Sequence, residues 1–269
     1  MYLLYSDETN LEPRDFEFFI YGGIAIPGDN AKSLHDSIEK TRHKYDVPAD
    51  CLLKFNPTPE CLTHQQYINV KQSMIESAVS HGCRFFVSAI LHNIATSPDD
   101  ARRKEINRIT YHYDCFLSRL NDYGLVLVDR FYDGQIDAHL REKFAIGLRG
   151  FPYTDPMRLA RIIGFHYSAI GQSHFSSIVD IALGSFRYAV NVHARNDQKN
   201  MPAARKLLKL IEPLFLRNPY TNNVDEISLF FSPKVVDAPK YKDKYQSLKD
   251  FLYDNGITAG QEITNMRKY

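Results

Sequence analysis

The sequence predicts an α/β domain in which helices flank a mixed sheet. Apolar segments of strand length alternate with amphipathic segments of helix length along most of the chain, and this alternation is typical of a sheet packed between helices. The first two strand-like segments, residues 1–7 and 17–27, have no helix between them, so we expect them to pair antiparallel. Helices precede the later strands, which can therefore join the sheet through crossover connections.

Residues that break strands or cap helices mark where each expected element begins and ends. Pro27 and Gly28 end the second strand and open the first helix, Thr63 precedes the second helix, and Gly124 ends the longest one. The expected strands are 1–7, 17–27, 51–55, 84–91, 125–129, 162–167 and 227–231. The expected helices are 31–45, 64–80, 101–122, 135–147, 177–194, 202–216 and 241–254.

One domain with helical additions fits a chain of 269 residues. A hydrophobic fraction of 44%, with 13% aromatic residues, is enough to build a substantial core. No stretch of linker composition separates the elements. We therefore expect a sheet domain over residues 1–200 and a helical extension, packed on the same domain, over residues 201–269.

The composition excludes several classes of protein. No segment approaches the roughly 20 consecutive apolar residues that span a bilayer, and the first residues lack the pattern of a signal peptide. The cysteines at 51, 61, 83 and 115 form no C-x-x-C pair, so we expect free thiols in a reducing cytoplasm and no zinc site built on them. The net charge of +1 leaves nucleic acid open as a partner, because a basic patch can lie on a neutral protein. We expect no membrane partner.

Two adjacent carboxylates, Asp7 and Glu8, follow the first strand. A charged group at the end of a buried strand must be paired, hydrogen-bonded or bound to metal, and carboxylate oxygen is the ligand that Mg²⁺ and Mn²⁺ prefer. Successive side chains of a strand point to opposite faces, so both carboxylates cannot face one ion. We favour Asp7 as the ligand and Glu8 as a helper or turn residue. A polar hairpin turn without metal is the alternative.

Two further acids occupy positions suited to the same site. Asp129 ends the strand 125–129, and Asp180 lies early in the helix 177–194. Gly184 shares the side of the helix that carries Asp180, so we expect this side to be small and polar and open to a bulky polyanion. Two strand-end acids and one helix acid can hold one or two Mg²⁺ ions for phosphodiester cleavage.

Each of these acids also has an ordinary structural interpretation. Asp129 could pair with Arg130 or simply end a strand, and Asp180 could be a first-turn acid that the helix dipole favours. His174, six residues before Asp180, is a candidate general base, although one of ten histidines can take such a place by chance. Taken together, two acids at strand ends and one early in a helix favour a single shared site over three unrelated acids.

Four short motifs form a set. They are Y-x-D-E-T-N at 5–10, G-G-I-A-I at 22–26, L-V-L-V-D at 125–129 and S-x-x-D-I-A at 177–182. Together, over about residues 1–190, they resemble the domain-of-unknown-function 3800 family. The resemblance implies a ribonuclease-H-like fold and a metal-dependent nuclease, often encoded beside mobile-element or phage-defence genes.

The resemblance also implies roles for individual residues. Asp7, Asp129 and Asp180 would be ligands of Mg²⁺ or Mn²⁺, with Glu8 as a helper. Lys54, in a Leu-Lys-Phe segment that resembles the short Lys-bearing strand of the family, would contact a phosphate. A solvated lysine is the alternative for that position.

The chain departs from the family pattern in two motifs. Thr9 and Asn10 stand where Ser-Gly is usual, and Asn tolerates the positive φ of such a turn. The residues around Asp180 replace the usual Leu-Gln-x-Ala-Asp. The match of Asp180 is therefore looser than that of Asp7.

Further basic groups are candidates for holding a nucleic-acid backbone. Arg149, Arg158 and Arg161 lie in a loop-rich stretch, and Arg187 shares a helix side with Asp180. Guanidinium groups suit phosphate contact. Each of these residues could equally belong to a solvated face.

The sequence thus predicts a ribonuclease-H-like α/β domain that acts in the cytoplasm as a Mg²⁺- or Mn²⁺-dependent nuclease on DNA or RNA. The resemblance adds a protein partner in a defence system. Two alternatives stay open: a non-catalytic module that binds nucleic acid or protein in a defence complex, and a metal-dependent phosphatase. A binding module needs no divalent ion at the acids. A nuclease needs an open basic groove, whereas a phosphatase needs a closed pocket.

Overall fold

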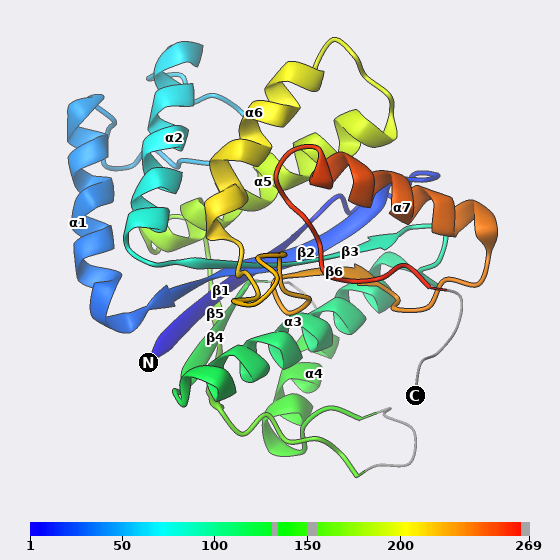
Figure 1. The fold of residues 1–269 in the computed structure, drawn as a ribbon. Helices are drawn as coiled ribbons and strands as arrows, with labels where there is room; N and C mark the ends of the chain where they lie inside the picture. The colour runs from blue at the N-terminus through cyan, green and yellow to red at the C-terminus, as the bar shows by residue number, and fades with distance from the viewer. Residues whose placement is uncertain (131–133, 150–154, 265–269) are drawn as a thin grey trace.

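Six strands form one mixed sheet in the residues that the computed structural model describes, which are 1–130, 134–149 and 155–264 (Figure 1). The strands are β1 (Tyr2–Thr9), β2 (Phe18–Pro27), β3 (Arg84–Leu91), β4 (Gly124–Asp129), β5 (Ile162–Ser168) and β6 (Leu229–Ser232). Their order in the sheet is β5-β4-β1-β2-β3-β6. β2 runs antiparallel to both β1 and β3, whereas β4, β5 and β6 run parallel to the strands beside them.

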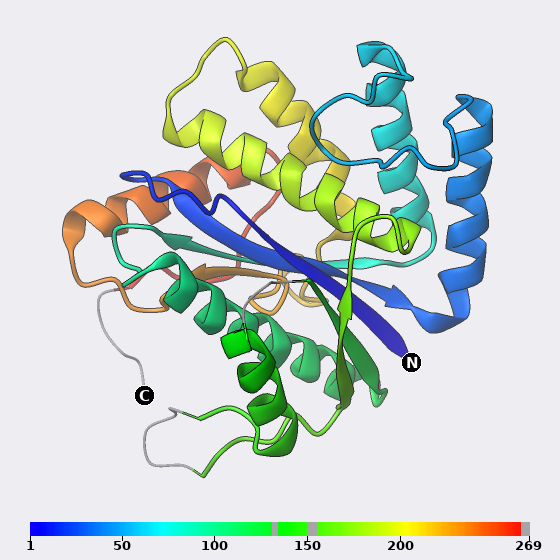
Figure 2. The ribbon, with the colours of Figure 1, turned by 180° about the vertical axis from the view of Figure 1, so that it is seen from behind.

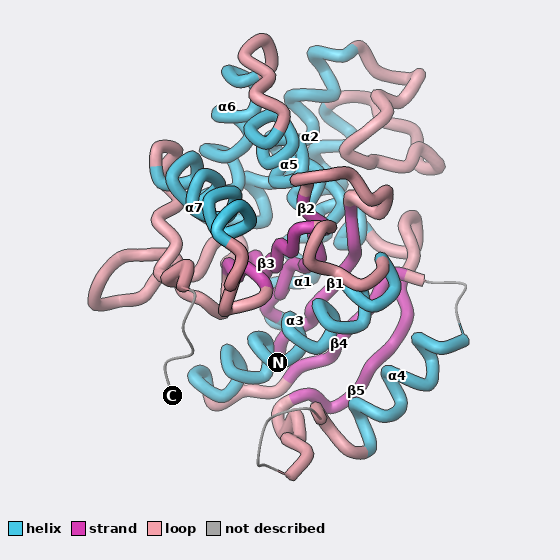
Figure 3. Tube along the Cα trace, turned by 90° about the vertical axis from the view of Figure 1, so that its right-hand side faces the viewer, coloured by secondary structure: helices cyan, strands magenta, loops and turns pink. Residues whose placement is uncertain are grey.

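Helices cover both faces of this sheet. The helices of the described residues are α1 (Gly28–Lys44), α2 (His64–Ser80), α3 (Pro98–Leu120), α4 (Gly134–Ala145), α5 (His174–Ala194), α6 (Met201–Ile211) and α7 (Pro239–Tyr253), with a 3₁₀ turn at Glu212–Leu214. α3 and α4 pack on one face and the other five on the opposite face (Figures 1 and 2). The view in Figure 3 shows the sheet between these two layers. The predicted α/β class is confirmed, and the strand order and directions are consistent with a ribonuclease-H-like fold.

The pleat of β1 sends its side chains into two separate cores. Tyr5 packs with the core that contains α1, α2, α5, α6 and α7, whereas Leu4 packs with the core that contains α3 and α4. Successive side chains of a strand alternate between faces, and β1 continues past both carboxylates. Asp7 therefore points to the α5 side and Glu8 to the α3 side.

Local capping explains where two helices begin and end. Thr63 accepts a hydrogen bond from the backbone of Gln66, whose side chain bonds back to Thr63, so the predicted bounds of α2 are confirmed. α3 begins earlier than expected because Ser97 caps it by accepting from the N–H of Asp100. Asn121 ends α3 in the left-handed conformation, which Asn tolerates.

Residues 51–55, expected as a short strand, form an irregular loop instead. The guanidinium of Arg42 donates to the carbonyl of Cys51 at 3.1 Å, and the ammonium of Lys71 donates to the carbonyl of Phe55 at 3.2 Å. Side chains of α1 and α2 thus satisfy backbone carbonyls that a strand would have paired within the sheet.

The chain beyond residue 200 packs against the same sheet. α6 and α7 share a core with α5, and β6 pairs with β3, so this region adds an edge strand as well as helices. The N–H of Leu91 in β3 donates to the hydroxyl of Tyr245 at 2.9 Å, which ties α7 to the sheet. No helix within the described ranges has an apolar run long enough to cross a bilayer.

Candidate metal centre

The carboxyl ends of three parallel strands meet at one edge of the sheet. Ser6 of β1 lies beside Val128 of β4, and Asp129 of β4 lies beside Ser168 of β5. Asp7 follows Ser6 as Asp129 follows Val128, so the two aspartates hold equivalent positions on neighbouring strands. Such strands lie about 4.8 Å apart, and this edge of an α/β sheet is where ligands usually bind.

Asp180 joins the two strand aspartates from α5, which crosses the sheet on the Asp7 side (Figure 2). A pocket of about 70 Å³ lies between the three carboxylates. Lys54 reaches it from the loop before α2, and Ser168 and Ser176 add hydroxyl groups. The structure therefore brings together Asp7, Asp129 and Asp180, which the sequence analysis grouped in one site, and adds Lys54 to the same pocket.

The loop before α2 closes one side of the pocket. The N–H of Phe55 donates to Oδ2 of Asp180, next to Lys54 in the lining. The Phe55 side chain lies against α5, where a Cβ added at Gly184 would come within 2.3 Å of its Cγ. The expectation of an open helix side at Gly184 is therefore wrong, because Phe55 covers that backbone.

The aspartates repel one another in a partly dehydrated site. Burial raises the pKa of Asp7 well above its ordinary range, and the charges of Glu8, Asp129 and Asp180 raise it further. Burial also raises the pKa of Asp129, with Asp180 adding to the increase and Lys54 opposing it. A divalent cation among these oxygens would offset both the repulsion and the cost of dehydration.

Glu8 lies on the opposite face of β1 and meets Arg102 of α3 at 3.3 Å. Its side chain is only 7% exposed, and Oε2 has no hydrogen-bond partner among the described residues. Burial raises the pKa of Glu8 to about 7 although Arg102 opposes the shift. Glu8 thus adds charge close to Asp7 without facing the same pocket, as the strand alternation predicts.

The donor set suits a hard divalent cation. Three carboxylates offer only oxygen, which Mg²⁺ and Mn²⁺ accept readily. Oδ1 of Asp7 accepts the N–H of Glu8 at 2.8 Å, and Oδ2 of Asp180 accepts the N–H of Phe55. These bonds orient both carboxylates and leave the second oxygen of each for an ion. The oxygens of the three aspartates do not all lie within 4.8 Å of one another, so a bound ion requires side-chain rotations that draw them inward.

A larger cavity of about 630 Å³ begins where β1 ends. Asn10 lines it with a φ of 65°, as expected for an Asn at this turn, and exchanges amide hydrogen bonds of 2.8 and 3.0 Å with Asn191 of α5. Arg187 also lines it. The Nε of Arg187 is buried and finds no hydrogen-bond partner among the described residues, so it could donate to an anion.

The other predicted basic residues lie elsewhere. Arg161 precedes β5, at the end of the parallel strands opposite the aspartates, with its guanidinium 5.2 Å from the ring centroid of Tyr123. Arg149 pairs with Glu142 of α4 at 3.4 Å, and Arg158 is exposed. The structure does not bring these three arginines to the pocket, and their contact with nucleic acid stays a prediction.

Two groups that shape the site, the N–H of Phe55 and the guanidinium of Arg102, could not be predicted from the sequence. A third group, His174, lies away from the site where it was expected. The N–H of Phe55 carries no sequence signal, because every residue except proline has one. Arg102 is one of several basic residues in its helix, and nothing in the pattern singles it out as the partner of Glu8. His174, a candidate general base, hydrogen-bonds Glu39 of α1 instead of facing the aspartates.

Comparison of the chain with protein-family models, with curated proteins and with solved structures found no match. The resemblance to the domain-of-unknown-function 3800 family therefore stays an expectation. The geometry of the aspartate pocket carries the functional conclusion.

Proposed function

We propose that this protein is a divalent-metal-dependent nuclease that hydrolyses phosphodiester bonds of DNA or RNA, with Mg²⁺ or Mn²⁺ as its cofactor. The observation that carries the proposal is the convergence of Asp7, Asp129 and Asp180 on one pocket at the carboxyl ends of β1 and β4. Burial and neighbouring acids raise the pKa values of Asp7 and Asp129, so ionisation of these two groups weakens the fold unless a cation offsets their charge. Groups perturbed in this way gather at functional sites.

The residues around the pocket have distinct tasks in this reaction. A bound cation supplies an activated water and stabilises charge on the phosphate oxygens. Asp7, Asp129 and Asp180 hold the cation, and the N–H of Phe55 fixes the orientation of Asp180. The ammonium of Lys54 lies in the lining, where it can bind a phosphate oxygen by a charge-assisted hydrogen bond.

Cavity sizes favour an extended substrate over a small ester. The pocket of about 70 Å³ has room for an ion and a few waters, and a nucleotide is too large for it. The cavity of about 630 Å³ is large enough for part of a nucleic-acid strand and has Arg187 on its wall. Its lining is of mixed charge, because Arg14 pairs with Glu12 and Arg195 with Glu17. The sizes of the two cavities, and not a basic lining, favour a nuclease over the alternative phosphatase.

Cleavage of labelled single- and double-stranded DNA and RNA tests the proposal. We expect cutting that depends on Mg²⁺ or Mn²⁺ and falls by at least about 100-fold in Asp7→Asn, because loss of a group that only orients a metal ligand already costs about 10–100-fold. Asp36→Asn, on the exposed side of α1, is the matched control and should cut normally.

Two other results would count against the nuclease, and a third would count against its proposed site. Absence of cutting, with no divalent ion bound in calorimetry, would overturn it and favour a non-catalytic module that binds nucleic acid or protein. Hydrolysis of p-nitrophenyl phosphate without cutting of any nucleic acid would favour the phosphatase. Cutting that Asp7→Asn leaves unchanged would place the chemistry elsewhere in the chain.

The biological setting of the proposal rests on two expectations. Free cysteines favour a reducing cytoplasm. The resemblance alone implies a protein partner within a phage-defence system or mobile element. Co-expression with the products of neighbouring genes, followed by purification of the tagged chain, would reveal such a partner. Recovery of the chain without any partner would remove this part of the proposal and leave the nuclease assay unaffected.

A further inference from the structure

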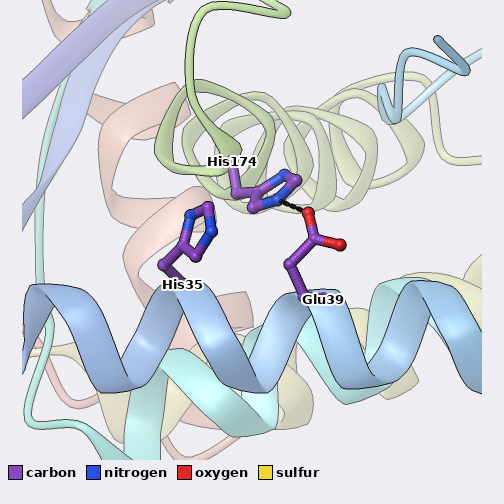
Figure 4. Close-up of side chains that lie close together, drawn as sticks. All are labelled: His35, Glu39 and His174. Carbon is purple, nitrogen blue, oxygen red and sulfur yellow. Dashed lines mark hydrogen bonds and ion pairs between the residues drawn. The ribbon is translucent and has the colours of Figure 1, made fainter. Parts of the chain in front are cut away.

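A second cluster of metal-binding side chains lies near the start of α5 and faces α1 (Figure 4). His35 and Glu39 are one turn apart on α1, and His174 is the first residue of α5. The ligand atoms of the three residues all lie within 4.8 Å of one another. Nε2 of His174 hydrogen-bonds Oε1 of Glu39, and the ring centroids of His35 and His174 are 4.9 Å apart.

We propose that His35, Glu39 and His174 form a Zn²⁺ site that is separate from the aspartate pocket. Two imidazoles and one carboxylate supply three protein ligands, the number found in zinc sites that keep a fourth position for water. Imidazole nitrogen favours Zn²⁺, Cu²⁺ and Ni²⁺, whereas the oxygen-only aspartate pocket favours Mg²⁺. The two sites should therefore select different metals.

The spacing of the cluster is close to what the metal requires. Zinc–ligand bonds of about 2.0–2.2 Å place the ligand atoms of a tetrahedral site roughly 3.4 Å apart. The widest pair in the cluster, at no more than 4.8 Å, must therefore close by roughly 1.4 Å at most. His35 is exposed and the other two residues are half-buried, so side-chain rotation can provide this movement.

A third histidine lies near the cluster but is not fixed to it. His43, one turn further along α1, places its Nε2 4.0 Å from Oε2 of Glu39, which is beyond hydrogen-bond distance. Its side chain is exposed. The proposed ligand set is therefore His35, Glu39 and His174 alone.

A metal at this position would clamp α1 to the beginning of α5. His174 lies six residues before Asp180 on the same helix, a distance of about 9 Å at 1.5 Å per residue. The ion would thus fix the end of the helix that carries Asp180 into the aspartate pocket.

Calorimetric titration with Zn²⁺ tests the site in the full chain carrying Asp7→Asn and Asp129→Asn, which weaken the other metal site. We expect one Zn²⁺ to bind, and His35→Ala to weaken binding by at least about 100-fold, because loss of a residue that only orients a ligand already costs about 10–100-fold. His64→Ala, at the exposed start of α2, is the matched control and should bind as tightly as its parent. Co²⁺ in place of Zn²⁺ should give visible absorption bands that His35→Ala lacks.

Two results would overturn the Zn²⁺ site. One is a parent protein that binds Zn²⁺ no more tightly than His35→Ala does. The other is an equal loss in His64→Ala, which would indicate unspecific binding to surface histidines. Because the parent lacks two of the predicted Mg²⁺ ligands, failure of this test leaves the nuclease proposal standing, and failure of the nuclease assay leaves the Zn²⁺ site standing.

Discussion

The backbone N–H of Phe55 donates a hydrogen bond to Oδ2 of Asp180, although 125 positions separate the two residues. The bond holds one oxygen of a predicted metal ligand. It also fastens to α5 the loop that brings Lys54 into the pocket. The contact between the Phe55 side chain and Gly184 should therefore control the geometry of the site.

Gly184→Ala should displace Phe55 and weaken its hydrogen bond to Asp180. The new Cβ would lie 2.3 Å from Cγ of Phe55, which is too close for side-chain carbons. Overpacking of this kind lowers the free energy of unfolding by about 1–3 kcal/mol. Under the proposed function, a shift of about 1 Å in a positioning group can lower the cleavage rate by about 100-fold. Urea denaturation and the nuclease assay measure the two effects.

Gly124→Ala is the matched control for that substitution. Its Cβ would lie 2.1 Å from the Tyr113 hydroxyl, at the end of β4 away from the aspartates. We expect a loss of stability with little change in the cleavage rate of the folded protein. If folded Gly184→Ala cleaves as fast as Gly124→Ala, Phe55 does not position the site.

Asp7→Asn should stabilise the protein at neutral pH when no divalent cation is bound. Burial and the neighbouring acids raise the folded-state pKa of Asp7, so the free energy of unfolding falls as pH rises above the unfolded pKa of about 3.9. Asn is neutral and keeps an oxygen that can accept the N–H of Glu8. We expect a gain of about 0.5–2 kcal/mol, the size typical of stabilising substitutions, in urea denaturation with EDTA.

Mg²⁺ should stabilise the wild type and leave the stability of Asp7→Asn unchanged. A ligand that binds only the folded state raises stability, so Mg²⁺ should raise the unfolding midpoint of the wild type and not that of Asp7→Asn. An equal response of both proteins would contradict metal binding at Asp7.

The features that could be predicted from the sequence are those set by nearby residues. The start of α2 follows from the pairing of Thr63 with Gln66, which are three residues apart in the chain. Asp7 and Asp129 could be placed together because each ends an apolar strand, and the carboxyl ends of parallel strands share an edge. Asp180 could be placed on the correct helix, but its hydrogen bond from the N–H of Phe55 could not be predicted.

The features that could not be predicted depend on contacts between distant residues. Residues 51–55 contain a short apolar run, and such a run does not distinguish a strand from a loop. Contacts from Arg42, Lys71 and Asp180 decide its shape. Gly184 indicated an open helix face in the sequence, and only the position of Phe55 shows that the face is covered.

Glu8 should make the stability of the protein fall with rising pH. Burial raises its pKa from 4.5 to about 7, and Arg102 opposes this only in part. Between these two values the folded state binds more protons than the unfolded state, so the free energy of unfolding decreases across that window and levels off above about pH 7. A pKa change of this size corresponds to roughly 3 kcal/mol.

Glu8→Gln isolates this contribution from the other acids. The difference in unfolding free energy between Glu8→Gln and the wild type, followed by urea denaturation from about pH 4 to pH 8, should grow through the window. Arg102→Gln should enlarge the wild-type slope, because it removes the positive charge that favours ionised Glu8. If the unfolding free energies of Glu8→Gln and the wild type changed in parallel with pH, the pKa of Glu8 would not be raised in the folded protein.

Cys51 and Cys61 should form a disulfide under mild oxidation. Both are free thiols, and their Sγ atoms are 3.3 Å apart, compared with about 2.05 Å in a disulfide. Burial and the neighbouring Cys61 raise the pKa of the Cys51 thiol to about 11, so we expect the exposed Cys61 to react first with diamide. The Cys51 thiol then attacks Sγ of this Cys61 adduct, so that the S–S bond forms as the S–N bond breaks, and diamide leaves as the hydrazine with the two electrons and two protons that the thiols lose.

This disulfide would close the loop that carries Lys54 and Phe55. Closing a short loop stabilises a protein by about 2–3 kcal/mol through the unfolded chain, so the oxidised protein should unfold at a higher urea concentration and return to the original midpoint with dithiothreitol. Cys51→Ser should abolish the effect, whereas Cys83→Ser, at a buried position in the core, should leave the diamide-dependent shift in place. Linked dimers on a non-reducing gel, without an intramolecular bond by mass spectrometry, would show that the two thiols do not meet in solution.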